Sequence, residues 1–233
     1  MECIILAGGL GTRLRTVVDD MPKCMAPISN KPFLYYLLQW LNKYDASRVI
    51  LSVGYLHEII ENWVADNKNL FNFEIDFAIE NEPLGTGGAI RLAFEKINSD
   101  KVVIINGDTF FDIDIDSFFK QHNQSNAILS IALKPMNKFD RYGNVLMNNN
   151  KITDFKEKVF CESGLINGGI YVLNKDNPFF DDLPAKFSFE TDVLNRSARK
   201  GFIHGFVFDN YFIDIGIPDD YALANRELIK MIK

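Results

Sequence analysis

The sequence predicts an α/β fold in which a mostly parallel, mixed sheet is flanked by helices, and three observations support this class. Short apolar runs alternate along the chain with segments whose apolar residues recur at helical spacing. Glycine-rich or Asn-Gly turns directly follow two of these runs, as turns at the carboxyl ends of parallel strands do. Hydrophobic residues make up 47% of the 233 residues, which is enough for a full core. We therefore expect a Rossmann-like arrangement with helices on both faces of the sheet.

The first half of the chain alternates between the two kinds of segment. The run at 3–7 is uniformly apolar, as a strand buried on both faces would be, whereas 73–79 alternates apolar with charged residues. Pro32 stands at the start of an apolar helical segment, where proline is tolerated. This order predicts parallel pairing, with strands at 3–7, 49–53, 73–79 and 102–105 and helices at 33–44, 56–64 and 89–97.

The second half of the chain has a different rhythm. An Asn-rich turn at 148–150 separates two strand-like segments and predicts a hairpin, and Pro135 is expected to end the strand before it. We expect this half to extend the sheet with some antiparallel pairing and to cover the mouth of the first half. One domain over 1–233 is expected, with strands at 127–133, 142–145, 151–155, 170–173, 202–208 and 211–213 and helices at 189–198 and 219–233.

Charge and composition exclude several classes of protein. The net charge of −6 argues against a nucleic-acid surface, because such surfaces are basic. No apolar run is long enough to span a bilayer, and the start lacks the features of a signal peptide. Cys3, Cys24 and Cys161 are scattered and odd in number, which favours a reducing compartment over a disulfide scaffold. A cytoplasmic location is therefore expected.

The first predicted strand runs into a glycine-rich loop that contains Gly8, Gly9 and Gly11. Glycine lets the main chain approach a ligand closely, and a strand that ends in such a loop exposes several N–H groups, which favours phosphate. Arg13 and Lys23 follow soon after and can offset the charge of a triphosphate. The loop therefore predicts a nucleoside triphosphate site, although a plain glycine turn between a strand and a helix explains the same residues.

Two common nucleotide motifs do not match this loop. The dinucleotide fingerprint needs a third glycine where Leu14 stands, which weakens an alternative in which the chain is an NAD-dependent oxidoreductase. The P-loop needs Gly-Lys followed by Ser or Thr, which this loop does not contain. The loop thus predicts phosphate binding without completing either motif.

Two carboxylates follow apolar strands at positions that suit a magnesium ion. Asp108 ends the turn Asn106-Gly107-Asp108, and Asp214 follows a short apolar strand. Because ligands of parallel sheets bind beyond the carboxyl ends of strands, the two side chains could share Mg²⁺ against phosphate oxygens. Each could equally be a turn residue or a helix cap. A nearby acidic run has a period of two, which predicts a solvated strand face formed by Asp112, Asp114 and Asp116.

Four other places could complete a substrate site, and each also has an ordinary structural explanation. The glycine-rich turn 85–88 could approach a base or sugar, and a lysine of 156–158 could meet a second anion. Asn167-Gly168-Gly169 could present an amide to a hydroxyl group, and Glu190 could accept hydroxyl hydrogen bonds or favour a helix start. No histidine nucleophile or zinc site is expected from the isolated His57, His122 and His204.

Taken in order, these motifs resemble those of the sugar-1-phosphate nucleotidylyltransferases. The opening is similar to the start of that family through Leu6-Ala7-Gly8-Gly9-Leu10-Gly11-Thr12-Arg13-Leu14 and then Pro22-Lys23. The likeness spans nearly the whole chain through Gly85-Thr86-Gly87-Gly88-Ala89, Asn106-Gly107-Asp108, Glu157-Lys158, Asn167-Gly168-Gly169-Ile170-Tyr171, Glu190 and Asp214-Ile215-Gly216. The chain also resembles a short bacterial branch of this family, which acts on heptose 1-phosphate with GTP. This closer resemblance lies at Arg15, Met25-Ala26-Pro27 and 187–192.

The resemblance implies a role for each matching residue, on a fold of the nucleotide-diphospho-sugar transferase type. The catalytic residues would be Arg13, Lys23 and Asp108, and Mg²⁺ would be the cofactor, held by Asp108 and Asp214. In the half at about 1–125, the nucleotide would be bound by Leu6, Ala7, Gly8, Gly9, Gly11, Thr12, Arg13, Lys23, Gly85, Thr86, Gly87, Gly88, Asn106 and Asp108. The sugar phosphate, bound mainly by the half at about 126–233, would contact Gly107, Lys158, Asn167, Gly169 and Glu190. Thr16 and Val159 stand where the family usually has proline, and the second departure makes Lys156 a rival to Lys158.

The implied reaction joins a nucleoside triphosphate to a sugar 1-phosphate and releases pyrophosphate. In the heptose branch the substrates would be GTP and D-glycero-alpha-D-manno-heptose 1-phosphate, and the product would serve capsule or surface polysaccharide synthesis. Mannose, glucose or amino-sugar 1-phosphates with GTP, UTP or dTTP are alternatives, as is a nucleotide-sugar sensor without turnover. The implied partners are small molecules, and the 20 phenylalanines allow an interface between copies of the chain as well as a large core.

Overall fold

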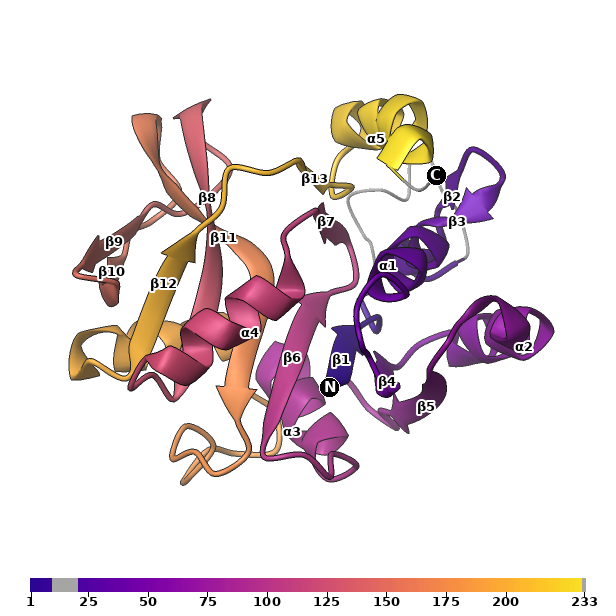
Figure 1. Ribbon diagram of the computed structural model, residues 1–233, viewed down its shortest axis with the longest axis horizontal. Coiled ribbons are helices and arrows are strands. Elements are labelled where there is room, and N and C mark those ends of the chain that lie inside the picture. The colour runs from indigo at the N-terminus through magenta and orange to yellow at the C-terminus, as the bar shows by residue number, and fades with distance from the viewer. Residues whose placement is uncertain (10–20, 232–233) are drawn as a thin grey trace.

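The computed structural model describes residues 1–9 and 21–231, and one sheet runs across it from edge to edge (Figure 1). Within these residues the sheet has nine strands in the order β5-β4-β1-β6-β11-β8-β12-β10-β9. Parallel neighbours build the part from β5 to β6, β12 is parallel to β8, and the other pairs are antiparallel. The expected α/β class is confirmed, with strands β1 (Glu2–Leu6), β4 (Arg48–Val53), β5 (Glu74–Ile79), β6 (Lys101–Asn106), β8 (Leu129–Phe139), β9 (Val145–Asn148), β10 (Lys151–Phe155), β11 (Cys161–Asn174) and β12 (Ile203–Val207).

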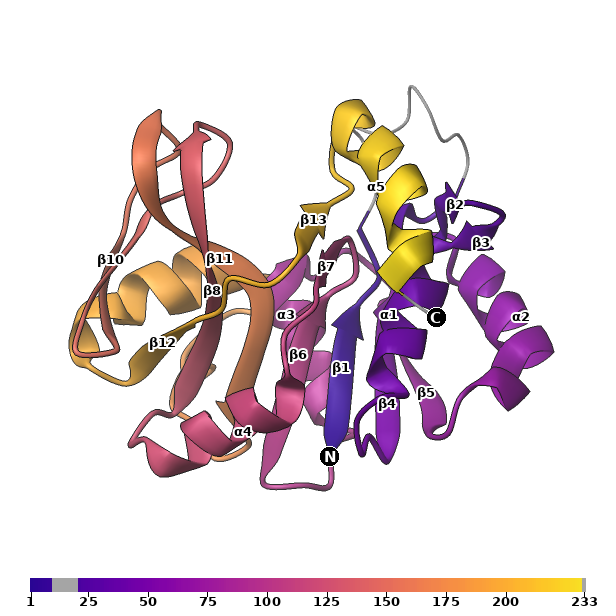
Figure 2. The same ribbon diagram turned by 45° about the horizontal axis from the view of Figure 1, so that its top comes forward.

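Strand β1 shows why helices cover both faces of the sheet. Its side chains alternate, so Cys3 and Ile5 enter one hydrophobic core and Ile4 enters the other. The first core is closed by α1 (Phe33–Leu41), α2 (His57–Asn67), α4 (Ile115–Gln124) and α5 (Pro218–Met231). The second core is closed by α3 (Gly85–Phe94) and the π-helical segment η3 (Phe189–Asn195), which lie behind the sheet in Figure 2. Among the described residues, no helix combines the length and the apolar character needed to cross a membrane.

Helix α4 and the residues before it correct the expectation for the acidic run. The run does not form a solvated strand face, because Asp114 is the N-cap of α4 and accepts a hydrogen bond from Ser117 N–H at 2.9 Å. The sequence reasoning missed this helix, which packs Ile115 and Phe118 into the first core. Only local cap geometry distinguishes the two interpretations, since both place aspartates on alternate positions.

Several boundaries also differ from expectation. The strand predicted at 170–173 is β11, which begins at Cys161 and contains Asn167-Gly168-Gly169. Pro135 does not end its strand, because β8 continues to Phe139; beyond Leu133 it pairs with β11 alone, and a strand with one neighbour tolerates a residue without N–H. The first hairpin strand lies at β9 rather than 142–145. The glycine-rich turn 85–88 is the first turn of α3, so the helix begins four residues earlier than expected.

A small antiparallel ribbon, separate from the main sheet, begins three residues after the end of β6. It pairs β7 (Thr109–Phe111) with β13 (Phe212–Asp214), and Asp214 is the register partner of Thr109. A second short ribbon pairs β2 (Pro27–Ile28) with β3 (Lys31–Pro32) before α1, and short 3₁₀ turns lie at η1 (Lys23–Met25), η2 (Lys68–Leu70) and η4 (Ala198–Lys200). The ribbon of β7 and β13 matters most, because it brings the end of the chain back to the end of β6.

Candidate active site

The carboxyl ends of β1 and β6 lie side by side, because Leu6 is the register partner of Asn106. The N–H of Gly107 donates to the carbonyl of Leu6 at 3.1 Å, and a Cβ at Gly107 would lie 2.4 Å from that oxygen. Only glycine permits this approach. The loop residues Gly8 and Gly9 therefore lie next to 106–108, as expected, while the predicted Gly11, Thr12 and Arg13 lie outside the described residues.

The two predicted metal ligands come together, although they are far apart in the chain. Asp108 precedes β7, and the pairing of Asp214 with Thr109 places the second carboxylate beside the first. Lys23 joins them: its Nζ donates to Asp108 Oδ2 at 2.6 Å and lies 3.6 Å from Asp214 Oδ1. Gly216 N–H donates to the same Asp214 oxygen at 2.7 Å. One ammonium thus lies between two carboxylates at the end of the sheet.

The charges of this cluster do not cancel. Burial and the charge of Asp108 raise the pKa of Asp214, and Lys23 only partly opposes them. The side chain of Asp214 is 27% exposed and that of Lys23 is 14% exposed, so solvent screens this pair poorly, whereas Asp108 is 39% exposed. With both aspartates ionised, one negative charge remains in excess, which favours a further cation.

A divalent metal fits this donor set. Hard cations bind carboxylate oxygens, and Mg²⁺ in particular is held by one or two carboxylates together with substrate phosphates and water. Asp108 and Asp214 offer two such carboxylates on one side of the cluster. In the part of the chain that the structure describes, no three His, Cys, Asp or Glu side chains are arranged so that they could hold a metal ion together, so the remaining ligands would be phosphate and water oxygens.

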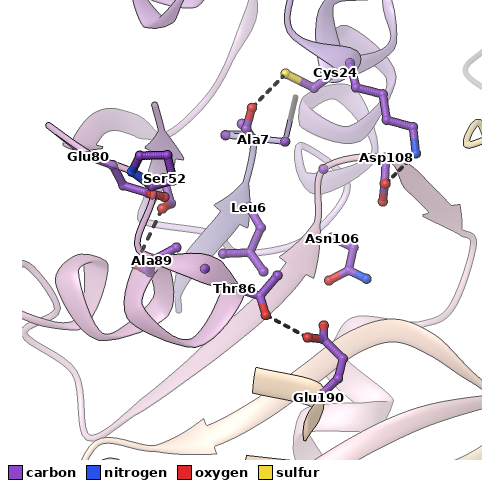
Figure 3. Close-up of a pocket in the computed structure, with 16 residues that line it drawn as sticks. Leu6, Ala7, Cys24, Ser52, Glu80, Thr86, Ala89, Asn106, Asp108 and Glu190 are labelled. Carbon is purple, nitrogen blue, oxygen red and sulfur yellow. Dashed lines mark hydrogen bonds and ion pairs between the residues drawn. The ribbon is translucent and has the colours of Figure 1, made fainter. Parts of the chain in front are cut away.

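A cavity of about 370 Å³, called here the first cavity, opens over the ends of β1 and β6 (Figure 3). This volume lies in the range of small-molecule sites. The cavity brings together most of the residues predicted for the nucleotide, namely Leu6, Ala7, Gly8, Gly9, Lys23, Gly85, Thr86, Asn106 and Asp108. Gly107 and Glu190 from the predicted sugar-phosphate set line it as well.

Several residues of the first cavity were missed by the sequence reasoning. Glu80 directly follows β5; its Oε2 accepts the N–H of Leu84 at 2.9 Å, and burial raises its pKa. A carboxylate that follows a strand was the available signal. No sequence pattern indicated Cys24 as a cavity residue. Burial raises the pKa of its thiol to about 12, so the thiol stays protonated at neutral pH. Further lining comes from Ser52, Pro83 and Ala89.

A second cavity of about 560 Å³ adjoins the first and shares Asn106, Asp108 and Glu190 with it. Its lining comes from both halves of the chain and contains Lys156, Lys158, Asn167 and Asp214. Lys156 Nζ donates to Asp154 at 2.7 Å, whereas Lys158 makes no ion pair with the described residues. Both candidate lysines therefore line the second cavity. Of the two, Lys156 is paired with a carboxylate, and Lys158 has no such partner among the described residues.

Asn167 and Gly169 lie on a bulge of β11, where the register against β8 shifts. The Nδ2 group of Asn167 donates to the Tyr171 hydroxyl at 2.9 Å, and its Oδ1 accepts Gly169 N–H at 3.0 Å. Gly169 has a φ of +75° and packs against Asn106, and it lines neither cavity. Gly169 therefore shapes the bulge that presents Asn167.

Arg141 and Tyr142 are functional candidates that no motif had indicated. The Arg141 guanidinium donates to Asp220 at 2.5 Å and to the Tyr142 hydroxyl at 2.9 Å. That hydroxyl in turn donates to Asp214 Oδ2 at 3.5 Å, and both residues line the second cavity. The chain thus adds a cation and a phenol beside Asp214 from a segment in which the sequence predicted only a strand at 142–145 and no site residue.

The predicted site residues Gly87 and Gly88 are buried and line neither cavity. A Cβ at Gly87 would lie 2.2 Å from the ring of Phe187, and one at Gly88 would lie 2.5 Å from the carbonyl of Ala185. These two glycines therefore face the segment before η3 rather than the cavity.

Comparison with known proteins places this geometry among enzymes of one kind. A family model described as nucleotidyl transferase matches residues 2–231. The D-glycero-alpha-D-manno-heptose 1-phosphate guanylyltransferase of Aneurinibacillus thermoaerophilus is 50% identical over 228 residues, covering 98% of each chain. The enzyme of the same name from Campylobacter jejuni is 47% identical over 224 residues, covering 95% of this chain and 97% of that one.

A solved structure agrees with the sequence comparison. HddC from Yersinia pseudotuberculosis superposes with a TM-score of 0.86 at 41% identity, covering 97% of this chain and 98% of that chain. A second structure of the same protein, complexed with GMP-PN, gives a TM-score of 0.84 over the same shares of the chains. This chain and HddC thus share one fold over nearly their whole lengths.

Proposed function

This chain belongs to the nucleotidyl transferase family, and from that premise we propose that it joins GTP to D-glycero-alpha-D-manno-heptose 1-phosphate and releases pyrophosphate. One observation carries the proposal: Lys23 lies between Asp108 and Asp214 where the two cavities share residues. A reaction between two phosphorylated substrates needs positive charge at such a boundary, because two anions must approach each other there.

The first cavity takes the nucleotide. Gly8, Gly9 and Gly107 surround the ends of β1 and β6 with main chain that can lie against phosphates. Lys23 meets the α-phosphate from the side of Asp108. Roles for Gly11, Thr12 and Arg13 beside the phosphates are part of the same proposal, carried by the sequence motif.

The second cavity takes the sugar phosphate. Lys158 contacts its phosphate group, while Asn167 and Glu190 face the sugar hydroxyls. The phosphate oxygen attacks the α-phosphorus in line; the new O–P bond forms as the bond to the bridging oxygen of pyrophosphate breaks. The attacking oxygen is already an anion, so the step needs no general base. No histidine lines either cavity within the described residues, which agrees with this chemistry.

A divalent cation completes the charge balance of the site. Asp108 and Asp214 would hold it, and when bound it would neutralise charge on the reacting phosphates. We propose Mg²⁺ because the donor set offers two carboxylates and leaves room for phosphate oxygens. Lys23 keeps the two carboxylates together and supplies the nearest fixed positive charge.

The remaining parts of the proposal concern the context of the reaction. The continuous sheet from β5 to β9 supports one nucleotidyltransferase domain over 1–233. We place the enzyme in the cytoplasm, with a nucleotide-activated heptose for surface polysaccharide synthesis as its product. Its partners are then its small-molecule substrates.

The experiment that tests this function is pyrophosphate release with Mg²⁺, crossing GTP, UTP, dTTP and CTP against a panel of sugar 1-phosphates. We expect turnover confined to GTP with the heptose 1-phosphate. Turnover with another pair would keep the reaction and change the substrates. Nucleotide binding without any turnover would indicate a non-catalytic sensor.

A further inference from the structure

A hydrogen bond runs from Thr86, in the first cavity, to Glu190, which lines both cavities. We propose that Thr86 is a positioning residue for the sugar phosphate. Thr86 lies in the first turn of α3 and lines the first cavity, whereas Glu190 lies in η3 and lines both. The inference rests on the proposed function, because it assigns Thr86 to the sugar phosphate rather than to the nucleotide expected from its motif.

Two hydroxyl groups fix one oxygen of the Glu190 carboxylate. Thr86 Oγ1 donates to Oε2 at 2.6 Å (Figure 3), and Ser188 Oγ donates to the same oxygen at 3.0 Å. Oε1 accepts no hydrogen bond from the described residues. The carboxylate is therefore oriented through one oxygen and offers the other to a ligand, as an acceptor for sugar hydroxyl groups.

Thr86 also holds the start of η3. Its Oγ1 accepts the N–H of Phe189 at 2.9 Å, so one hydroxyl group satisfies a helix-terminal donor and orients the carboxylate that follows it. The adjoining main chain is docked on α3 as well: Phe187 N–H donates to Leu84 at 3.0 Å, and Gly87 N–H donates to Phe187 at 3.0 Å. Several hydrogen bonds thus fix the position of Glu190 relative to α3.

The glycines of this turn explain how the docking is possible. Gly85 has a φ of +73°, and a Cβ there would lie 2.5 Å from the carbonyl of Phe187. Side chains at Gly87 and Gly88 would meet Phe187 and Ala185 equally closely. The glycine-rich turn 85–88 therefore leaves space for the segment 185–189 to pack closely against it. Thr86 is the one residue of 85–88 with a side chain that can form hydrogen bonds to this segment.

The test compares Thr86→Val, which keeps the shape and removes the hydroxyl, with Thr86→Ser, which keeps the hydroxyl. We expect Thr86→Val to raise the KM for heptose 1-phosphate about five- to tenfold, the cost of losing one hydrogen bond to a charged group at an exposed site. The KM for GTP should stay within about twofold of wild type, and Thr86→Ser should restore the sugar-phosphate KM. Thr191→Val is the matched control, because the exposed Thr191 side chain makes no hydrogen bond with the described residues.

Two outcomes would overturn the proposal directly. A raised KM for GTP with an unchanged sugar-phosphate KM would make Thr86 a nucleotide ligand. An undiminished effect of Thr86→Val in a Glu190→Gln background would show that Thr86 does not act through Glu190.

A measurement without substrate separates this proposal from the proposed function. Urea unfolding midpoints of wild type, Thr86→Val, Glu190→Gln and the double variant form a cycle, in which we expect the double variant to shift less than the sum of the single shifts. Additive shifts would overturn the Thr86–Glu190 contact. A wild-type enzyme without turnover would overturn the proposed function, while the cycle would still decide the contact.

Discussion

The two cavities meet at Asn106, Asp108 and Glu190, yet they are built in different ways. Almost all of the first cavity comes from segments before residue 110: the loop after β1, the turn after β6 and the start of α3. The second cavity collects side chains from widely separated segments, including Arg141, Lys158 and Asp214. The first cavity combines four glycines with four charged residues, whereas the second is lined by seven charged residues and two glycines.

On the proposed function, this difference would let one fold keep a common reaction and vary its second substrate. A triphosphate needs N–H groups at strand ends, which a short contiguous motif can supply. A particular sugar phosphate needs several side chains at chosen positions, and these are free to differ from segment to segment. On the proposed function, the boundary between the cavities, where Lys23 joins Asp108 and Asp214, serves both ligands. Substitutions at the boundary should therefore have larger effects than those within one cavity.

The largest effect is expected at Lys23. Lys23→Ala removes the ammonium between the two carboxylates and should lower kcat by about 10²-fold or more, the size seen when a charge-stabilising donor is lost. Steady-state pyrophosphate release measures it, with circular dichroism to confirm the fold. The control is Lys120→Ala, an exposed lysine on α4. Normal turnover by Lys23→Ala would remove Lys23 from the reaction.

The next effect is expected at Asp108. Asp108→Asn removes one of two carboxylates that could hold a divalent ion, so activity should lose its dependence on Mg²⁺. Calorimetric titration of Mn²⁺ gives a second readout that does not require turnover, and it should show no saturable binding. Asp116→Asn, at an exposed position in α4, should bind the ion like wild type. An unchanged metal response in Asp108→Asn would be incompatible with the proposed ligand role.

A smaller effect should sharpen the description of the second cavity. Lys158→Ala should raise the KM for sugar phosphate about tenfold and leave the KM for GTP unchanged, because a single charge-assisted contact is lost. Lys156→Ala should change the KM for sugar phosphate by about twofold or less, since Lys156 is already paired with Asp154. Initial rates at varied sugar phosphate decide between them. The reverse ranking would assign the phosphate to Lys156.

The smallest effect is expected on the free energy of unfolding in the absence of metal. We expect opposite signs for an aspartate in the site and for one outside it. Burial and Asp108 raise the pKa of Asp214 above 3.8, so its ionised form is disfavoured in the folded protein. Stability is then lost as pH rises from about 3.8 through the raised pKa, and the cost is complete above it. Asp214→Asn should therefore raise the urea midpoint at pH 7 in the presence of a chelator, while it impairs metal-dependent turnover.

Asp76 provides the comparison of opposite sign, away from both cavities. Burial opposes the shift, but hydrogen bonds from Phe77 N–H and Arg48 lower the pKa of Asp76, so its contribution to stability is present above 3.8 and lost as pH falls. Asp76→Asn should lower the urea midpoint at pH 7. If both variants were destabilised to a similar degree, the unfavourable ionisation assigned to Asp214 would be incorrect.

Sequence reasoning predicted the first half of the molecule well because its signals are local. The short apolar runs in β1 and β6 are typical of strands with both faces covered, and the glycines after them mark where these strands end. It failed at Asp114, because a helix cap and a solvated strand face produce the same alternation of aspartates. It also overlooked Glu80, although a carboxylate directly after a predicted strand is the same signal that singled out Asp108.

The sequence by itself determined the α/β class, the order of the strands along the chain, the glycine loop and the family to which the ordered motifs belong. Spacing and composition encode these features within a few residues of each other. Tertiary structure alone decided that Asp214 meets Asp108 through the β7–β13 ribbon, that Arg141 and Tyr142 lie beside them, and that Gly85–Gly88 seat the segment before Glu190. Such contacts join residues up to about a hundred positions apart, and they depend on strand register and helix packing, which no local pattern specifies.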